Sequence, residues 1–406
     1  MDSIANAVKA TSGGCAVPVL GNTAKSSSPE LAKLSKAKRA ERYAALSSAR
    51  SWLGRTAFKI DPQKNPGDVY RTHDCRFARR SEFVSVNFAA IHQKAHYGNL
   101  ATCGSVWACP VCCQLVQQRR RPEITKLIEW AYAGDKTASM VTLTFPHTKF
   151  DSLGDLLSKQ RDAFKRLRSG KIWQGFKQRY GFDGLVRSLE LTHGKNGWHP
   201  HTHELWVTAP IHKRDQEDFR SFILDRWIKA CSASGLLDLA DPLQLHAFHL
   251  HAVDVRFDAK ESDYLAKQDS GRAWGVDREM ALASSKKGRA AGVHPHEFLV
   301  RQATGDYDRY IEYVNAMKGA RQLYWSSRLK ARVGVDEISD EQLAERETEQ
   351  AEVLGLLTAD QWRYVRGNDA RAELLDVAET GGWQGIENLL RSLGYEFLTN
   401  GLDPFG

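Results

Sequence analysis

The hydrophobic positions in the middle of the chain repeat with two periods. A period of two residues is typical of half-buried strands, and a period of about 3.6 residues is typical of amphipathic helices. This order of periods, β-α-β-β-α-β-α, predicts an α+β fold in which an antiparallel sheet carries helices on one face. The expected strands are 139–145, 185–192, 199–207 and 246–257, and the expected helices lie near 114–132, 152–180, 213–234 and 259–267.

Helices are also expected on both sides of this core. Residues 31–50 are basic and helical in pattern, and 295–333 have helical periodicity with Gly319 and Gly334 as stops. Ser339 begins a Ser-x-x-Gln pattern that favours a helix start. We therefore expect a flexible, basic arm (1–50), a Cys-rich region (51–135), the α+β core (136–270), a helical extension (271–335) and an acidic helical tail (336–406).

The two central strands are joined by "HGKNGW", whose Asn-Gly pair favours a hairpin turn. If Thr192 pairs with His199, Glu190 lies opposite His201, and both share a face with His203. Two imidazoles and a carboxylate on one face predict a divalent metal site. Mg²⁺ or Mn²⁺ is expected, and Co²⁺ or Zn²⁺ also fits such a ligand set. A register slip of one residue would remove the carboxylate from this face.

Other histidines have weaker patterns. His199 fits either a turn position or a phosphate contact. His249 and His251 repeat the spacing of two residues without a carboxylate on a partner strand, so this pair ranks second. The "HPH" at 294–296 is interpreted as a helix start, with Pro295 in the first turn.

Four of the seven cysteines are crowded into "CGSVWACPVCC". Cys109 and Cys112 form a Cys-Pro-x-Cys half-site that is typical of structural zinc, and Cys103 is a third ligand. Cys75 is the preferred fourth ligand over His96. This usage indicates metal binding in a reducing compartment, although buried free cysteines are the plain alternative.

The charge of the chain is unevenly distributed. Residues 336–406 contain 16 Asp or Glu and five Arg or Lys, so this segment carries −11 and the rest of the chain +19. A basic body of this size favours a polyanion such as DNA, and the alternative is an ordinary solvated surface. The expected phosphate-contacting residues are Arg76, Arg79, Arg80, Arg119, Arg120 and Arg121. The acidic tail would either compete with DNA for this surface, dock a host factor or simply pack.

Downstream, "KESDYLAKQ" places Tyr264 and Lys267 three residues apart on one helix face. With the strand "VTLTF" and the stretch "GWHPHTHELW", this order of motifs resembles the HUH endonucleases. Within that class, the chain is similar to single-tyrosine initiators of rolling-circle plasmid replication. The resemblance covers roughly 70–335 and includes the Cys-rich stretch. Thr202 stands where a bulky apolar residue gives the class its name, without disturbing the ligands.

The resemblance implies a metal-dependent enzyme that nicks and rejoins one DNA strand at a replication origin. Tyr264 would be the nucleophile, forming a 5′-phosphotyrosine link, with Lys267 steadying the phosphate. Relatives have an acidic residue one turn before the tyrosine, and Glu261 takes that place here. No phosphate-binding Gly-x4-Gly-Lys-Ser/Thr motif is present, so a host helicase and polymerase are expected partners. A cytoplasmic, bacterial and plasmid-encoded protein without a membrane span is expected.

Alternatives of other classes remain open at this point. A transposase or conjugative relaxase would share the same site, and a zinc-dependent DNA-binding regulator would have no catalysis. Tyr307, Tyr310 and Tyr313 recur at helical spacing and are interpreted as packing residues rather than as a second nucleophile.

Overall fold

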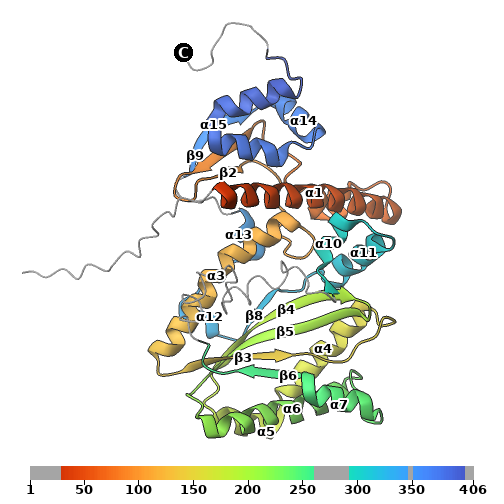
Figure 1. The fold of residues 1–406 in the computed structure, drawn as a ribbon, viewed down its shortest axis with the longest axis vertical. Helices are drawn as coiled ribbons and strands as arrows, with labels where there is room; N and C mark the ends of the chain where they lie inside the picture. The colour runs from red at the N-terminus through yellow and green to blue at the C-terminus, as the bar shows by residue number, and fades with distance from the viewer. Residues whose placement is uncertain (1–28, 260–291, 346–350, 398–406) are drawn as a thin grey trace, which may run out of the picture.

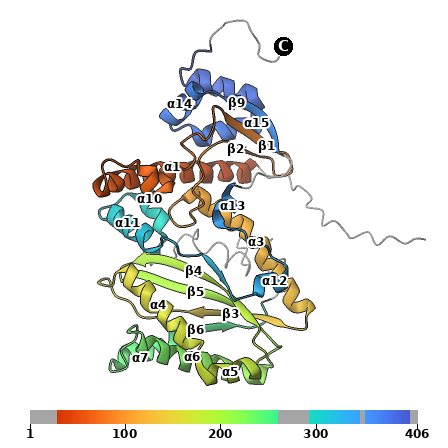
Figure 2. The same ribbon diagram turned by 180° about the vertical axis from the view of Figure 1, so that it is seen from behind.

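The computed structural model describes residues 29–259, 292–345 and 351–397. Its elongated body is divided along the long axis into a larger sheet at one end and a smaller sheet at the other, with helices between them (Figure 1, Figure 2). Within the described residues, no helix is both long and apolar enough to cross a membrane. Tyr264, Lys267 and Glu261 lie outside the described residues.

The larger sheet has the strand order β6-β3-β5-β4-β7, and β8 also pairs with β4. Every pairing in it is antiparallel, which confirms the predicted α+β fold. The short β8 was not predicted, because three residues carry too little periodicity to stand out within 295–333. The strands are β3 (Thr137–Leu143), β4 (Gly184–Gly194), β5 (Gly197–Thr208), β6 (Val253–Arg256), β7 (Gly292–Val293) and β8 (Leu323–Trp325).

The hairpin of β4 and β5 has the predicted register. Thr192 pairs with His199, and Glu190 pairs with His201. Gly197 ends the two-residue turn with φ +84°, and a Cβ atom there would lie 2.7 Å from the backbone oxygen of Thr148. Glycine is therefore required at the point where this turn meets the chain after β3.

One face of the sheet is covered by α4 (Leu153–Leu167), α5 (Gly170–Arg179) and α6 (Gln216–Ala233). Trp206 of β5 is fully buried beneath them and makes edge contacts with Trp173 and Phe219. A single helix was expected over 152–180, but Gly170 with φ +80° starts a separate helix and changes the chain direction.

Part of the opposite face is covered as well. Leu127 of α3 (Pro110–Ala133) and Leu329 of α12 (Leu329–Val333) pack in one apolar cluster with Leu205 and Val207 of β5. His201 and His203 precede Leu205 and Val207 at every second position on the same side of β5, beyond the covered part.

The segment expected as a strand at 246–257 is mostly helical. The Asp241 side chain accepts hydrogen bonds from two backbone N–H groups, and Pro242 follows it, so α7 (Pro242–His251) begins there. Within 246–257, only the four residues of β6 form a strand. His249 and His251 therefore lie on a helix, where a spacing of two residues turns them about 200° apart. They do not form the second histidine pair that the strand interpretation required.

A long helix, α1 (Pro29–Ile60), crosses the middle of the molecule, so the expected boundary at residue 50 falls inside it. Tyr310 and Tyr313 are fully buried, and the Tyr310 hydroxyl donates to the Ala108 carbonyl at 2.5 Å. These contacts agree with the packing interpretation of the tyrosines. The other elements here are α2 (Pro66–Val69), α10 (Pro295–Arg301), α11 (Asp306–Ala316) and the single 3₁₀ turns Arg71–His73 and Lys213–Asp215.

The smaller sheet has the order β2-β1-β9. Its strands are β1 (Val84–Ala89), β2 (Lys94–Tyr97) and β9 (Ala351–Leu357), none of which was predicted. Trp362 and Ile386 are fully buried against this sheet from α14 (Ala359–Gly367) and α15 (Arg371–Ser392). The C-terminal part was expected to be mostly helical, and α13 (Asp340–Glu345), α14 and α15 agree with this expectation. The unexpected strand β9 joins it to residues 84–97 in one α+β unit. Only α13 begins as predicted, with Ser339 and Gln342 exchanging the two capping hydrogen bonds.

Candidate metal centres

The first candidate centre lies on the hairpin surface. Glu190, His201 and His203 each offer a ligand atom within 4.8 Å of the others. The Glu190 Oε2 atom is 3.6 Å from the His201 Nε2 atom and 3.4 Å from the His203 Nε2 atom. Glu190 and His203 are each 7% exposed, so the three groups form a largely buried but reachable cluster.

These distances fit a shared metal ion better than direct hydrogen bonds. A hydrogen bond between nitrogen and oxygen is usually about 2.7–3.2 Å long. Ligands held about 2.1 Å from one ion at tetrahedral angles are about 3.4 Å apart. Three protein ligands also leave a position for water or substrate, as in catalytic sites. The residues present therefore fit a divalent cation.

Hydrogen bonding also sets the orientation of His203. Its Nδ1 atom lies 3.1 Å from the Thr142 hydroxyl of β3, the residue directly opposite it in the sheet. When Nδ1 donates to this hydroxyl, the lone pair is on Nε2 and faces Glu190. Such outer contacts fix the tautomer of a ligating histidine.

His199 stands one step further along the same side of β5. The His147 Nδ1 atom donates to the Asn196 carbonyl at 3.0 Å, so the His147 Nε2 atom accepts the hydrogen bond from His199 Nδ1 at 2.7 Å. The lone pair of His199 is consequently on Nε2. Burial, with the nearby charges of His201 and His147, lowers the pKa of His199 to about 3. It is a neutral acceptor next to the candidate centre. No sequence pattern indicated its partner His147, which lies in a different segment of the chain.

His294 also faces this region, although its sequence pattern indicated only a helix start. It is the N-terminal cap of α10, as predicted, and is 4% exposed. Burial lowers the pKa of His294 well below its usual value, the charge of His296 adds to this effect, and the Glu190 carboxylate opposes it.

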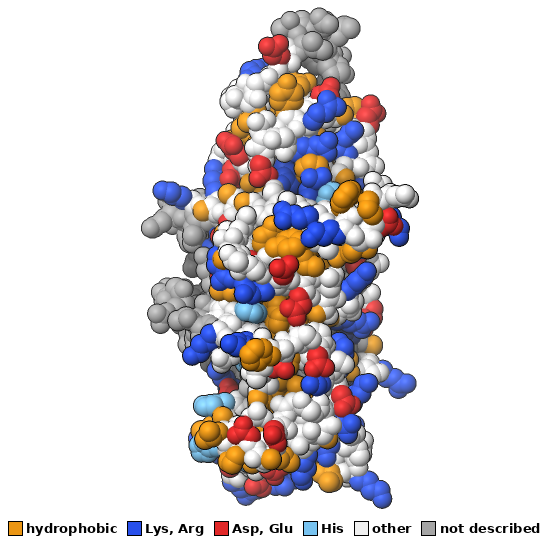
Figure 3. Space-filling view, turned by 90° about the vertical axis from the view of Figure 1, so that its right-hand side faces the viewer, with side chains coloured by type: hydrophobic (Ala, Val, Ile, Leu, Met, Phe, Trp, Pro, Cys, Tyr) orange, Lys and Arg blue, Asp and Glu red, His pale blue; other side chains and the backbone are white. Residues whose placement is uncertain are grey.

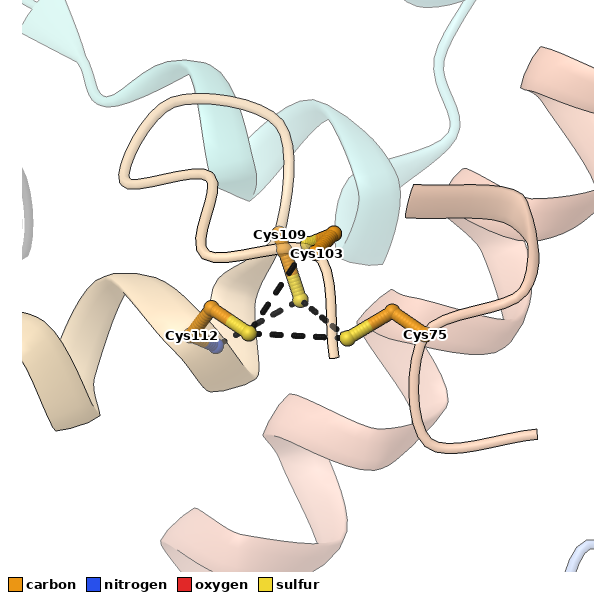
Figure 4. A group of neighbouring side chains, drawn as sticks. All are labelled: Cys75, Cys103, Cys109 and Cys112. Atoms are coloured by element: carbon orange, nitrogen blue, oxygen red, sulfur yellow. Dashed lines mark hydrogen bonds between the residues drawn. The ribbon is translucent and has the colours of Figure 1, made fainter. Parts of the chain in front are cut away.

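The second candidate centre is a cluster of four buried cysteines, Cys75, Cys103, Cys109 and Cys112 (Figure 4). The Cys112 sulfur is 3.5 Å from that of Cys75 and 3.8 Å from that of Cys103, and the Cys75 and Cys109 sulfurs are 3.7 Å apart. Four thiolates about 2.3 Å from one zinc ion would be about 3.8 Å apart, whereas disulfide sulfurs are about 2 Å apart. The cluster fits a structural zinc ion.

Backbone N–H groups donate hydrogen bonds to two of the four cysteine sulfurs. Cys109 caps α3, and its sulfur accepts from the Cys112 N–H at 3.4 Å, while the Cys103 sulfur accepts from the Ser105 N–H at 3.4 Å. Hydrogen bonds from Cys103, Cys109 and Cys75 lower the pKa of Cys112 well below its usual value. Burial raises the pKa of Cys103 and Cys109, so metal binding at this site would release protons.

The preference for Cys75 over His96 agrees with the geometry. His96 is in β2, paired with Asn87 of β1, and is not among the clustered ligands. Cys113 is buried next to Cys112 but is likewise outside the group. Cys231 is buried within the α6 face, where burial raises its pKa.

Several of the arginines expected to contact DNA are instead bound by α13 and its flanks. Arg120 is 7% exposed and forms ion pairs with Glu123 at 2.6 Å and Asp340 at 2.8 Å. This burial corrects the expectation that Arg120 contacts phosphate. Arg119 donates to the Leu343 carbonyl. Arg121 is half-buried on α3.

The arginines of the Cys75 loop have different surroundings. Arg76 is next to the cysteine cluster: burial by itself would lower the pKa of Arg76, but negative charge at Cys112 and Cys75 raises it. Arg79 donates to the carbonyls of Ser81 and Glu82. Arg80 is exposed and pairs with Glu345 at 2.8 Å. On the face in Figure 3, lysine and arginine side chains are spread along the whole height of the molecule rather than gathered in one patch.

Comparison with known proteins gives a match over the part of the chain that contains the hairpin centre. Residues 97–229 match the family model described as "Replication protein". This part of the chain is therefore similar to a replication protein, and it is called the Rep domain below. This Rep domain includes Glu190, His201 and His203, together with the three cysteines Cys103, Cys109 and Cys112.

Two curated relatives extend this finding. The chain is 26% identical to "Protein rep" of Streptomyces lividans over 298 residues, which cover 58% of this chain and 64% of the relative. It is 35% identical over 132 residues to "Neomycin resistance protein" of Streptomyces cyanogenus, covering 26% of this chain and 30% of that protein. The chain thus spans less than two thirds of either relative. No solved structure matches.

Proposed function

We propose that this protein initiates rolling-circle replication of a plasmid by nicking and rejoining one DNA strand at the origin. The observation that carries the proposal is the convergence of Glu190, His201 and His203 on one surface inside the Rep domain. The "Protein rep" relative supports the same role. The plasmid setting and cytoplasmic location belong to the proposal, as do the partners: the double-stranded origin, the single-stranded nick site, and a host helicase and polymerase.

A divalent metal bound by these three residues, Mg²⁺ or Mn²⁺, would polarise the scissile phosphate and stabilise its developing charge. The Tyr264 hydroxyl loses its proton and forms a bond to phosphorus, and the bond from phosphorus to the 3′ oxygen breaks. The leaving 3′ oxygen takes up a proton and becomes a free 3′-OH that primes synthesis. Rejoining reverses these steps, since the energy of the phosphodiester is retained in the phosphotyrosine.

The remaining assignments follow from the resemblance of the sequence motifs. Lys267 would steady the phosphate or the phenolate of Tyr264, since a nearby ammonium group favours the ionised nucleophile. Glu261 would assist the step that ends a replication round. Zinc at the cysteine cluster would hold the Cys75 loop against α3 and contribute folding energy, without taking part in the chemistry.

Recovery of a covalent adduct tests this function without knowledge of the origin sequence. The full-length protein is incubated with Mn²⁺ and a random library of single-stranded DNA, and adducts that survive detergent are sequenced and digested to peptides. We expect DNA joined through its 5′ end to Tyr264, with loss of the adduct in Tyr264→Phe. Tyr324→Phe, which alters an exposed tyrosine, is the control. Zinc-dependent DNA binding without any adduct would favour a non-catalytic regulator instead.

A further inference from the structure

His294 lies at the edge of the hairpin centre and has no part in the ligand set proposed above. It directly follows β7, whose two residues pair with the end of β4. Its backbone remains extended, with φ −71° and ψ 143°, so the next position of this ladder is opposite Thr192. Directly opposed residues project from the same face of a sheet. His294 is therefore on the face that carries Glu190.

The position of the proton on His294 follows from its hydrogen bonds. The Nδ1 atom accepts from the backbone N–H of His296 at 3.2 Å. A neutral imidazole that accepts at Nδ1 carries its proton on Nε2. This Nε2 atom is buried and has no hydrogen-bond partner within the part of the chain that the structure describes.

A role as a helix cap explains only one of the two ring nitrogens. The capping box with Glu297 uses Nδ1 and the backbone of His294. Among the described residues it leaves Nε2 as a buried donor without an acceptor, which is a destabilising arrangement that native proteins rarely retain without a reason. An asparagine would provide the same cap without this cost.

We propose that the His294 Nε2–H group donates a hydrogen bond to an oxygen of the phosphate bound at the Glu190, His201 and His203 centre. The inference rests on the proposed function, because it takes the ligand to be a phosphodiester. Nε2 carries a proton in this tautomer, so it has no lone pair for a metal ion. His294 is thus a substrate-binding group and not a further metal ligand.

Two substitutions separate the ring nitrogens. In His294→Asn the side-chain oxygen replaces Nδ1 as the cap, but no donor reaches the position of Nε2. In His294→Gln the side-chain amide places an N–H group near the Nε2 position but leaves the cap incomplete. Each variant, as full-length protein containing its zinc, is titrated with Mn²⁺. Binding of inorganic phosphate to the Mn²⁺-loaded protein is then measured from the broadening of its phosphorus NMR signal.

We expect His294→Asn to bind Mn²⁺ like the wild type and to bind phosphate about tenfold more weakly, the usual effect of losing a hydrogen bond to a charged group. His294→Gln should retain phosphate binding and unfold at a lower temperature. Equal phosphate affinity in His294→Asn and wild type would overturn the inference, as would a loss of Mn²⁺ affinity. Failure of the wild type to bind Mn²⁺ would instead reject the proposed function.

Discussion

Each metal centre depends on which atoms the surrounding hydrogen bonds leave available. Thr142 orients His203 toward Glu190, and the pair His147 and His199 leaves a lone pair on His199. Around the cysteines, backbone N–H groups donate to Cys103 and Cys109. Thr142 and His147 lie outside the ligand motifs, whereas the donors to the cysteines belong to the Cys-rich stretch itself. All of these contacts predict how individual substitutions will act.

Substitution of the hairpin histidines should remove metal binding. His201→Ala or His203→Ala takes away one of three ligands, and we expect Mn²⁺ affinity to fall by at least about tenfold, as for even the outer contacts of metal sites. The matched control is His249→Ala and His251→Ala, the same spacing on helix α7, which should leave Mn²⁺ affinity unchanged. Isothermal titration with Mn²⁺ measures both. Equal losses in the two sets would reject the hairpin centre.

The cysteine cluster predicts a contrast between two buried cysteines. Cys75→Ser should release about one zinc ion per chain and lower the unfolding temperature, because structural zinc contributes folding energy directly. Cys113→Ser alters a buried thiol outside the cluster and should keep the zinc. Elemental analysis of the purified proteins decides between these outcomes. Zinc that is retained in Cys75→Ser would count against Cys75 as a ligand.

His296 should make stability depend on pH. Its Nε2–H group donates to the Trp107 carbonyl at 2.6 Å, and burial lowers the pKa of His296 to about 4. The unfolded state, with a pKa near 6.5, binds this proton first, so stability is complete above about pH 6.5 and is lost as pH falls toward 4. At pH 5 the loss is about 2 kcal/mol.

Urea unfolding at pH 5 and 7.5 measures this loss. His296→Gln keeps an N–H donor but does not titrate, so its stability should change less between the two pH values than that of the wild type. His212→Gln alters an exposed histidine and should follow the wild type. If the stability of His296→Gln differs between pH 5 and pH 7.5 as much as that of the wild type, other titrating groups cause the loss.

At the scale of elements, local sequence determined some features and distant contacts determined others. The hairpin register was predictable, because its turn and its histidines lie within about 20 residues. The break before Gly170 and the cap at Asp241 are local signals that the periodicity hid. Nothing local indicates that β9 pairs with β1, since the partners Val84 and Leu357 are far apart in the sequence. For the same reason, the sequence could not place His147 or His294 at the hairpin centre.

The turn of the hairpin should be sensitive to a single methyl group. Gly197→Ala forces a side chain into φ +84° and against the Thr148 carbonyl, which we expect to cost about 1–3 kcal/mol and to weaken Mn²⁺ binding by shifting Glu190 relative to His201. Gly175→Ala in α5 has open space around it and should stabilise the protein by about 0.5–1 kcal/mol. Thermal unfolding of the two variants and the wild type measures these changes in stability. An unchanged Gly197→Ala protein would contradict this account of the turn.

At the scale of the whole molecule, the acidic C-terminal part is joined to the basic body by packing as well as charge. Leu343 of α13 is 4% exposed in the main core, and β9 extends the sheet of residues 84–97. Deleting the chain after Val335 would therefore expose two cores instead of simply removing a charged tail. Competition with DNA is better tested by neutralising charges while the fold is kept.

Two exposed ion pairs connect α13 to the surface around the cysteine cluster. Arg71 is 3.7 Å from Glu341, and Arg80 is 2.8 Å from Glu345. If these arginines belong to the DNA-binding surface, α13 occupies them in the free protein. The double variant Glu341→Gln and Glu345→Gln should then bind nonspecific duplex DNA more tightly at low salt. Up to two added phosphate contacts would steepen the salt dependence, so the gain should shrink as salt rises.

The control must change net charge by the same amount elsewhere. Glu217→Gln with Asp360→Asn neutralises two exposed carboxylates outside α13, which pair with Arg220 and Arg363 on their own helices. Fluorescence anisotropy over a range of salt concentrations compares the two double variants. A larger gain in the α13 variant than in the control would mean that α13 masks part of the DNA surface. Equal gains in DNA affinity would mean that net charge alone causes the effect. The C-terminal unit would then have no part in controlling access to DNA.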